Sequence, residues 1–392
     1  MFTALIDYWA KTGDDTYNAV ATQGILHQAD TGDFLPKNQS LTEGNDDQGV
    51  WALAAMAAAE NGFPSPSKDL PQWQDLAENV FNEFVGRWDT KVCGGGLRWQ
   101  IFSWNAGYNY KNSASNGVFF DLAARLFLQT KNSTYSEWAT KIFEWEQTAG
   151  LLTDSYQVYD GVQTASCDGA NKNVDKAQTG LPTGVFLHGS AVMYNATTSS
   201  DWKTRVDGLL KGVQDTFVSN GVLVEVSCES HGTCSTDLEA YKGFLVRSLQ
   251  ATAQLAPYTA ATIQPLLLTN AKAAASACSG SPSKGFAGQQ GTACGFSWAA
   301  SGGKAFDGLT GVGEQMNALS AVVSTLSLNG KGQSAPGSGS NGTSTGGSGS
   351  SKPSGTSGSG PATVSPKSSG SRVAAGSMTA LVVLGGIVYG LL

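Results

Sequence analysis

Residues 44–62 read GNDDQGVWALAAMAAAENG, a polar loop that passes into a long alanine-rich apolar run. Asn45 with Gln48 three residues later has the pattern of a capping box, so the sequence predicts a helix that is capped by Asn45. Gly62 after the run is a typical helix end. So much alanine lets neighbouring helices approach closely, and we therefore expect an inner, tightly packed helix.

Asp46 and Asp47 stand in the first turn of this helix. Two carboxyls roughly 5 to 5.5 Å apart are what a retaining glycosidase needs, one to attack the sugar carbon and one to protonate the leaving oxygen. Acidic residues also favour the positive end of a helix dipole without any catalytic role. A catalytic acid here needs its pKa raised, by burial or by the neighbouring carboxylate. A second pair, Asp14-Asp15, precedes a helix that begins near Tyr17, and we interpret it as a cap.

Apolar residues recur at helical spacing along most of the first 328 residues, in segments separated by turn-forming residues. The chain opens on an amphipathic helix over residues 1–9, and the pattern predicts further helices over 15–28, 46–61, 70–88, 113–130, 133–149, 184–195, 200–218, 237–255, 258–278 and 311–327. No credible long strand stands between them. Successive helical hairpins without a sheet predict an all-α fold, a toroid of paired helices.

Composition excludes several classes of protein. The chain has 392 residues, 41% of them apolar, which suffices for one large domain and an appendage. The net charge of −7 and the lack of a basic segment argue against nucleic-acid binding. The three histidines, His27, His188 and His231, are scattered along the chain. We therefore expect neither a histidine metal site nor a Ser-His-Asp triad, and no metal or cofactor.

Six cysteines without the close paired spacing of a zinc site predict three disulfides. The pairing that closes two short loops and leaves one long one is Cys228–Cys234, Cys278–Cys294 and Cys93–Cys167. The sequence alone does not choose this pairing among the connectivities that six cysteines allow. Sequons agree with a secreted glycoprotein, and they stand at Asn38, Asn132, Asn195 and Asn341.

Residues 93–112 hold further candidate site residues. The Gly94-Gly95-Gly96 run is not a phosphate loop, because no GK[ST] follows it and no strand precedes it. Arg98 and Trp99 follow this run. From the residues alone we interpret Arg98 as a structural ion-pair partner and Trp99 as a core aromatic. A polar and aromatic loop follows, which suits stacking on pyranose faces and bonding to hydroxyls but is also ordinary loop composition: Tyr108, Asn109, Tyr110 and Asn112.

The composition changes after residue 328. Gly, Ser, Thr and Pro dominate residues 329–370, which cannot bury a core, so we predict a flexible stalk. Residues 371–392 end in an apolar tail from Met378 that is shorter than the about 20 residues of a membrane span. With the small residues around Ser368, this tail has the form of a GPI-attachment signal that is removed on maturation, and a tail-anchored helix is the alternative.

The segment NDDQ at 45–48, followed by WALA at 51–54, resembles the catalytic segment of glycoside hydrolase family 76, the endo-α-1,6-mannanases, and in particular its GPI-anchored fungal cell-wall members. Further matching segments are CGGGLRWQIF at 93–102, GYNYKNS at 107–113, SNG at 115–117 and LTGVGEQM at 309–316. The resemblance covers residues 1 to about 328. It implies an (α/α)6 barrel in which the starts of the inner helices surround one cleft.

The resemblance also implies residue roles. Asp46 would be the nucleophile and Asp47 the acid/base. The substrate would be bound by the polar and aromatic residues of the matching segments, Asn45, Gln48, Arg98, Trp99, Tyr108, Asn109, Tyr110 and Asn112. One segment departs from the family, because QTGLPTGVFL at 178–187 lacks an aromatic and an amide that fungal relatives carry there. Family members also have a signal peptide and more of the domain before the first helix, so the resemblance implies a truncated start.

We therefore expect a monomeric, cofactor-free retaining enzyme whose donor is α-1,6-linked mannan or the mannose of a GPI glycan. A lipid anchor would hold it at the outer face of the plasma membrane and the cell wall. Water as acceptor would make it an endo-mannanase, and a β-1,3-glucan acceptor would make it a transglycosidase of cell-wall biogenesis. The rival hypothesis is a non-catalytic mannan-binding wall protein on the same scaffold. The altered segment 178–184 favours it, and the intact pair Asp46-Asp47 speaks against it.

Overall fold

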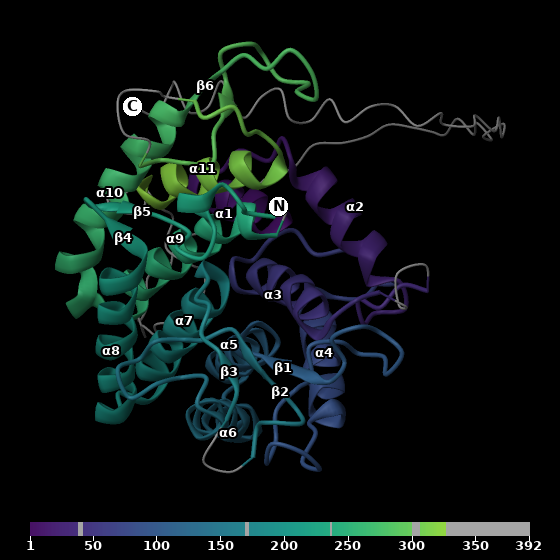
Figure 1. Cartoon of the computed structure of the whole chain (residues 1–392). Coiled ribbons are helices and arrows are strands. Elements are labelled where there is room, and N and C mark those ends of the chain that lie inside the picture. Colours follow the sequence, from purple (N-terminus) through teal and green to yellow (C-terminus); the bar gives the residue numbers. More distant parts are fainter. Residues whose placement is uncertain (38–41, 169–171, 236, 300–305, 327–392) are drawn as a thin grey trace, which may run out of the picture.

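The computed structural model describes residues 1–37, 42–168, 172–235, 237–299 and 306–326 (Figure 1). The helices along these ranges are α1 (Phe2–Thr12), α2 (Asn18–Ala29), α3 (Asn45–Glu60), α4 (Trp73–Arg87), α5 (Ser113–Thr130), α6 (Ser133–Ala149), α7 (Gly180–Thr197), α8 (Ser200–Phe217), α9 (Leu238–Leu255), α10 (Ala260–Ala277) and α11 (Val312–Ser324). The predicted all-α class is confirmed. Outside the described residues lie the predicted stalk and tail, Ser368, Asn38 and Asn341.

Six helices form a closed inner ring. In chain order α1, α3, α5, α7, α9 and α11 each contact the next, and α11 returns to contact α1. The helices α2, α4, α6, α8 and α10 pack against the outside of this ring, each on one or two inner neighbours (Figure 1). This is the predicted (α/α)6 arrangement, with six inner and five outer helices in the described part of the chain. No helix within these ranges has the length and apolar content that a bilayer span requires.

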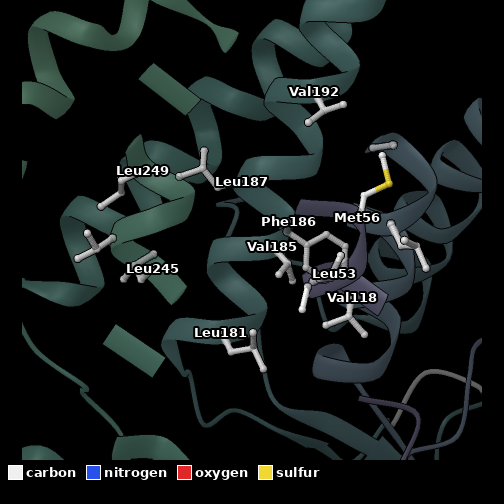
Figure 2. Packing of buried hydrophobic residues seen from close by; sticks show 14 of the residues in the cluster. Leu53, Met56, Val118, Leu181, Val185, Phe186, Leu187, Val192, Leu245 and Leu249 are labelled. Carbon is white, nitrogen blue, oxygen red and sulfur yellow. The ribbon is translucent and has the colours of Figure 1, made fainter. Parts of the chain in front are cut away.

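The core lies between neighbouring inner helices and between the inner and outer helices. Small residues let the inner helices approach one another closely. Figure 2 shows Leu53 and Met56 of α3 beside Val118 of α5 and Phe186 of α7. A Cβ added to Gly49 of α3 would clash with the side chain of Val118. The prediction that residues 46–61 form an inner, tightly packed helix is therefore confirmed.

Short antiparallel strands cover the loops at the ends of the helices. A three-stranded sheet has the order β1 (Tyr110–Asn112), β2 (Gly161–Gln163), β3 (Val174–Asp175). Two further ribbons pair β4 (Val218–Ser219) with β5 (Val222–Leu223) and β6 (Cys278–Gly280) with β7 (Ala293–Cys294). Two short 3-10 helices also occur, η1 (Glu229–His231) and η2 (Pro257–Thr259). Strands of two or three residues are too short for their alternation of apolar and polar residues to be recognised in the sequence. The pairing of β1 with β2 nevertheless orients loops of the candidate site.

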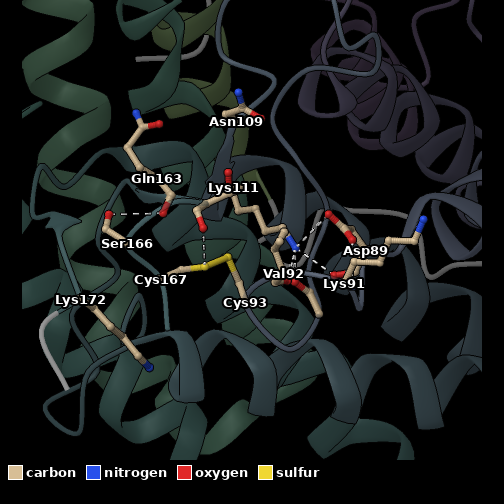
Figure 3. Close-up of a disulfide and its surroundings, with 12 residues drawn as sticks. Asp89, Lys91, Val92, Cys93, Asn109, Lys111, Gln163, Ser166, Cys167 and Lys172 are labelled. Atoms are coloured by element: carbon tan, nitrogen blue, oxygen red, sulfur yellow. Dashed lines mark hydrogen bonds and ion pairs between the residues drawn. A yellow bond between two sulfur atoms is a disulfide. The ribbon is translucent and has the colours of Figure 1, made fainter. Parts of the chain in front are cut away.

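The predicted disulfide pairing is confirmed, with bridges Cys93–Cys167, Cys228–Cys234 and Cys278–Cys294. The long-range bridge joins the loop after α4 to the loop after β2 (Figure 3). Beside it, the fully buried Lys111 donates hydrogen bonds from Nζ to the carbonyl oxygens of Asp89, Val92 and Gly95. One ammonium group thus gathers three backbone carbonyls of residues 89–95 and holds this turn in shape.

Three predicted helix starts are wrong by three residues or more. Helix α4 begins at Trp73 rather than at residue 70. Helix α7 begins at Gly180 rather than at residue 184, because Pro182 in its first turn is compatible with a helix although it reads as a loop signal. Helix α2 begins at Asn18 with Tyr17 at the cap position. Asp14 therefore does not cap α2. Its carboxylate accepts hydrogen bonds from the backbone N–H of Thr16 and from the hydroxyl of Tyr8, which shapes the preceding turn.

Candidate active site

The first turns of the inner helices meet at one end of the barrel. The side chain of Asn112, at the start of α5, bonds Asp46 at the start of α3. A Cβ added to Gly180, the first residue of α7, would lie 3.0 Å from the carbonyl oxygen of Tyr241 in the first turn of α9. Contacts of this kind require neighbouring inner helices to start side by side. The polar residues of these first turns are therefore brought together from distant parts of the sequence.

The turn before α3 differs in detail from the prediction. Gly44, with φ −89° and ψ 167°, is the cap residue, and Asn45 is the first helical residue. The backbone N–H of Gly44 donates to Oδ2 of Asp47 at 2.8 Å, so the capping partner is Asp47 and not Gln48. The predicted cap at Asn45 is wrong by one residue, because a glycine satisfies the extended geometry of the cap. The carboxylate of Asp47 is thus tied to the turn that precedes its own helix.

Both aspartate side chains approach Gly44. A Cβ on this glycine would have an oxygen of Asp46 and an oxygen of Asp47 within 3.2 Å of it. The two carboxylate oxygens are therefore at most about 6 Å apart. This limit includes the separation of roughly 5 to 5.5 Å that retaining glycosidases use. Adjacent residues in the middle of a helix point about 100° apart, whereas these two lie at its mouth and face the same space.

The environment raises the pKa of both carboxyls. Burial, followed by repulsion from Asp47, raises the pKa of Asp46 to about 7, although the amide of Asn112 donates to its Oδ2 at 3.2 Å and favours the charged form. Desolvation also raises the pKa of Asp47. The hydrogen bond from the Gly44 N–H lowers this pKa, and the negative charge of Asp237 raises it further. Groups that interact this closely titrate as a pair. Burial and mutual repulsion therefore favour the protonated form within the pair, and the larger rise in pKa is that of Asp46.

Asn45 and Gln48 support the turn from beneath. Asn45 is 1% exposed and Gln48 is fully buried. The guanidinium of Arg87 on α4 donates to both side-chain carbonyls, at 2.5 Å and 2.7 Å. The amide of Gln48 donates to Glu83 and to the carbonyl of Asp33. Because their polar groups are already engaged by protein atoms, these two residues have the geometry of positioning residues rather than of groups that face a ligand.

Residues 98–110 form a loop that lies beside the aspartates. The carbonyl of Trp99 accepts from the backbone N–H of Asn45 at 2.8 Å, and that of Arg98 accepts from the Asn45 side chain at 2.9 Å. The guanidinium of Arg98 pairs with Asp89 at 2.8 Å and lies 4.5 Å from the ring of Tyr108. Arg98 is thus an ion-pair partner, and Trp99, 37% exposed, is not a core residue.

Three predicted residues take different positions along this loop and after it. Asn109 is exposed and accepts from Arg98 at 3.2 Å. The hydroxyl of Tyr110 donates to Asp160 at 2.6 Å. Asn112 caps α5 through Oδ1, which accepts from the N–H of Ser115, and its amide is thereby free to reach Asp46. One side chain therefore serves both the helix start and the acid pair.

Several residues of the site carry little or no signal in the sequence. Asp237 and Tyr241 lie at the start of α9. The charge of Asp237 raises the pKa of Asp47, and the charge of Asp46 raises the pKa of Tyr241. They could have been found by inspecting the first turn of every second helix. Asp160 directly precedes the short strand β2 and has no such signal in the sequence. The site is therefore more acidic than the predicted set.

Glu43 is the least expected of these residues. It precedes Gly44, is 5% exposed, and neither carboxyl oxygen has a hydrogen-bond partner among the described residues. Burial, followed by the charges of Asp47 and Asp33, raises the pKa of Glu43 to about 8 despite the opposing charge of Arg87. At neutral pH the uncharged form of this side chain is therefore favoured, directly beside the turn that carries the acid pair.

The segment that departs from the family lies at the same end of the barrel. It contains the start of α7, where the N–H of Gly180 donates to both carboxyl oxygens of the fully buried Glu225, at 3.2 Å and 3.1 Å. An acidic side chain from outside α7 therefore satisfies this helix start. The effect of the altered segment on activity stays a prediction.

Comparison with known proteins places the chain among carbohydrate-active enzymes. The profile of glycosyl hydrolase family 76 matches residues 1–336. The Saccharomyces cerevisiae mannan endo-1,6-alpha-mannosidase DCW1 is 44% identical over 327 residues, which span 83% of this chain and 70% of the relative. The mannan endo-1,6-alpha-mannosidase DFG5 of the same organism is 39% identical over 329 residues, spanning 83% and 69%.

Solved structures agree with this assignment. Dfg5 from Chaetomium thermophilum, solved in complex with glucosamine, is 42% identical with a TM-score of 0.77, and the match covers 83% of this chain and 78% of that one. A variant of the α-1,6-mannanase GH76A of Salegentibacter sp. HEL1_6, inactivated at two aspartates and bound to α-1,6-mannotriose, has a TM-score of 0.65 at 19% identity, with coverage of 84% and 88%. The second likeness concerns the fold.

Proposed function

The chain belongs to glycosyl hydrolase family 76, and we propose that it is a retaining enzyme acting on α-1,6-linked mannosides at the fungal cell surface. The donor in this proposal is α-1,6-mannan or the mannose of a GPI glycan. The relatives named mannan endo-1,6-alpha-mannosidase support the linkage. The observation that carries the mechanism is the Asp46–Asp47 pair, two close carboxyls with raised pKa values at the mouth of an inner helix.

In the first step a carboxylate oxygen of Asp46 attacks the anomeric carbon. Asp47 gives its proton to the glycosidic oxygen, the bond from that oxygen to the anomeric carbon breaks, and a glycosyl ester on Asp46 remains. In the second step Asp47, now charged, takes the proton of an acceptor hydroxyl, whose oxygen attacks the same carbon and releases Asp46. Each step inverts the configuration at the anomeric carbon, so the product retains the configuration of the donor. The acceptor, water or a sugar, decides between hydrolysis and transfer.

Two contacts favour these roles, against the larger effect of burial, which raises the pKa of Asp46, the nucleophile in this proposal, to about 7. Asn112 donates to Asp46, which stabilises the charge that a nucleophile needs. Asp47 has Asp237 as a negative neighbour, which favours the protonated form that a general acid needs. Arg98, Trp99, Tyr108, Asn109 and Tyr110 lie on the adjoining loop, and we place the sugar-binding surface there. Asn45 and Gln48 belong to the support of the turn.

The location in this proposal rests on the sequence beyond the barrel. The stalk over 329–370 and a GPI signal with attachment at Ser368 would hold the enzyme at the outer face of the membrane, where wall polymers and newly delivered GPI glycoproteins meet. Glycans on Asn132 and Asn195 fit this route; Asn132 is exposed in the turn before α6. A secreted monomer with a lipid anchor is the form that we propose.

The test uses the full chain with an α-1,6-mannooligosaccharide donor and a β-1,3-glucan oligosaccharide, with products read by mass spectrometry. We expect mannose–glucan hybrids that vanish in Asp46→Asn and in Asp47→Asn. Asp15→Asn is the matched control. Asp15 follows the C-terminal end of α1, whereas the acid pair lies at the end of the barrel where the inner helices begin. Shortened mannosides without hybrids would assign hydrolysis.

The rival function is a mannan-binding wall protein without turnover, which the altered segment at 178–184 favours. A folded chain that binds mannooligosaccharides but forms no product would establish it. In that case Asp46→Asn would keep glycan affinity and change no rate.

A further inference from the structure

A second buried lysine lies near the start of α9, and the chemistry above does not use it. Lys242 is 1% exposed. Its Nζ donates to Oε2 of Glu229 at 3.0 Å and to the carbonyl oxygen of Phe296. The same atom lies 4.0 Å from the ring centroid of Phe296 and 4.9 Å from that of Trp298. Two hydrogen bonds and two aromatic faces therefore fix this ammonium group in place.

Lys242 joins two loops that disulfides close. Glu229 lies within the loop closed by Cys228–Cys234. Phe296 lies just after β7, which the bridge Cys278–Cys294 joins to β6. A closed loop has fewer conformations than an open one, so the partners of the lysine are themselves restricted. The bonds of Lys242 therefore anchor α9 to fixed points on both loops.

The first turn of α9 is held on two sides. Lys242 ties it to these loops, and the fully buried Asn317 of α11 donates to the carbonyl oxygen of Glu239 at 2.6 Å. Asp237 is the cap residue of this turn, and its carbonyl oxygen accepts from the N–H of Ala240 at 3.0 Å. The position of Asp237 therefore follows from the position of the turn to which it belongs.

Asp237 acts on the acid/base of the proposed reaction. Burial has the larger effect on the pKa of Asp47, and the negative charge of Asp237 raises it further. Because the side chain of Asp237 is exposed, its distance from Asp47 is set by the turn that carries it. Asp47 also interacts with the carboxyls of Asp46 and Glu43. The carboxyls whose charges interact with Lys242 are those of Glu225, Glu229, Asp307 and Glu314.

We propose that Lys242 is a positioning residue of the reaction, which fixes the first turn of α9 and thereby holds the carboxylate of Asp237 near Asp47. This inference rests on the proposed function, since it takes Asp47 as the acid/base. A side chain as buried as that of Lys242 does not touch a sugar. It acts on the chemistry through a charge that its own helix carries five residues earlier.

The first measurement is the pH dependence of kcat/KM of the full chain for an α-1,6-mannooligosaccharide. Asp237→Asn should move the alkaline limb, which reports loss of the proton of the acid, about half a pH unit lower. Lys242→Met should move it in the same direction, and the double variant should shift no further than Asp237→Asn alone. A direct effect of the lost cation would move the limb upward, because a nearby cation lowers the pKa of a carboxyl.

Three further variants control this result. Lys242→Arg keeps the charge and the donors and should recover most of the shift. Lys203→Met is the matched control, because Lys203 also pairs with a carboxylate, Asp207 at 2.7 Å, and lies 4.1 Å from the ring of Tyr258, but on the exposed face of α8. It should leave the profile unchanged. Glu229→Gln breaks the same ion pair from the other side, and it too should add nothing to Asp237→Asn.

The second measurement needs no turnover. Carbon-13 NMR of labelled aspartate carboxyls should show Asp47 titrating at lower pH in Lys242→Met, and amide hydrogen exchange should rise across residues 237–243. Both changes in a chain that converts no mannoside would retain the effect of Lys242 on Asp47 and overturn the proposed function. An unmoved titration of Asp47, an upward shift, or full additivity with Asp237→Asn would overturn the positioning role.

Discussion

The side-chain amide of Asn112 donates a hydrogen bond to Oδ2 of Asp46 across 66 residues of sequence, at 3.2 Å. The same side chain caps α5 through its other atom, Oδ1. One residue therefore joins the start of α5 to the carboxylate of Asp46, the nucleophile that we propose. This arrangement links the stability of an inner helix to the charge state of Asp46, and substitutions that separate the two functions can test each.

Asn112→Asp keeps a capping oxygen but replaces the amide donor by a negative charge. Because the amide lowers the pKa of Asp46 and a second carboxylate would raise it, the nucleophile of the variant should ionise only at higher pH. In the unaltered chain the acidic limb of kcat/KM should fall near pH 7, and in Asn112→Asp it should move upward by about one pH unit. Asn112→Ala should in addition lose about 1 kcal/mol of stability through the lost cap. An unmoved acidic limb in both variants would contradict the role of this bond.

Glu43→Gln should stabilise the chain at neutral and alkaline pH. Below the ordinary value of 4.5 the carboxyl is protonated in the folded and the unfolded chain, so its raised pKa has no effect there. Between 4.5 and about 8 the unfolded chain releases the proton and the folded chain keeps it, which destabilises the fold as pH rises. The variant should therefore gain about 1–2 kcal/mol at pH 8 and little at pH 4.

Urea unfolding of both chains at the two pH values measures this difference. Glu137→Gln on the exposed face of α6 is the control and should be neutral at both. A gain of equal size at pH 4 and pH 8 would mean that the effect does not come from proton release.

Glycine to alanine substitutions at two helical positions should change the stability of the fold in opposite directions. At Gly86 of α4 no atom lies within 4 Å of an added Cβ, so Gly86→Ala should stabilise by about 0.5–1 kcal/mol. At Gly49 of α3 the added Cβ would clash with Val118, so Gly49→Ala should destabilise by about 1–3 kcal/mol. Thermal unfolding measures both. Combining Gly49→Ala with Val118→Ala should give a smaller loss than the sum of the single changes, since the clash is then relieved.

Lys111→Met should loosen the turn over residues 89–95. Without the ammonium, the buried carbonyls of Asp89, Val92 and Gly95 lose their shared donor, which should lower stability by about 2–4 kcal/mol. Amide hydrogen exchange should rise across residues 89–97, which lead to Arg98. Lys211→Met, on the exposed face of α8, should change stability by less than about 0.5 kcal/mol. Unchanged exchange in this turn would show that the disulfide alone holds it.

The sequence by itself determined most of the helices. The bounds of α5 and α6 follow from local apolar spacing and from turn residues at their ends, which act within a few residues of themselves. It also determined the aspartate pair and, through the resemblance, the family. The start of α7 was misplaced because a proline in a first turn and a proline in a loop look alike until the helix is packed.

The tertiary structure decided which distant residues share the site. Asp237 and Tyr241 reach the aspartates, and Asp160 reaches Tyr110 and Tyr241, because the ring closes and the inner helices start at one end. Closure depends on contacts between segments up to hundreds of residues apart. It also decided that Asn45 and Gln48 support the turn, because burial and hydrogen-bond partners are set by α4 and not by their own segment. Local periodicity determines elements, and the packing of those elements determines which polar groups face one another.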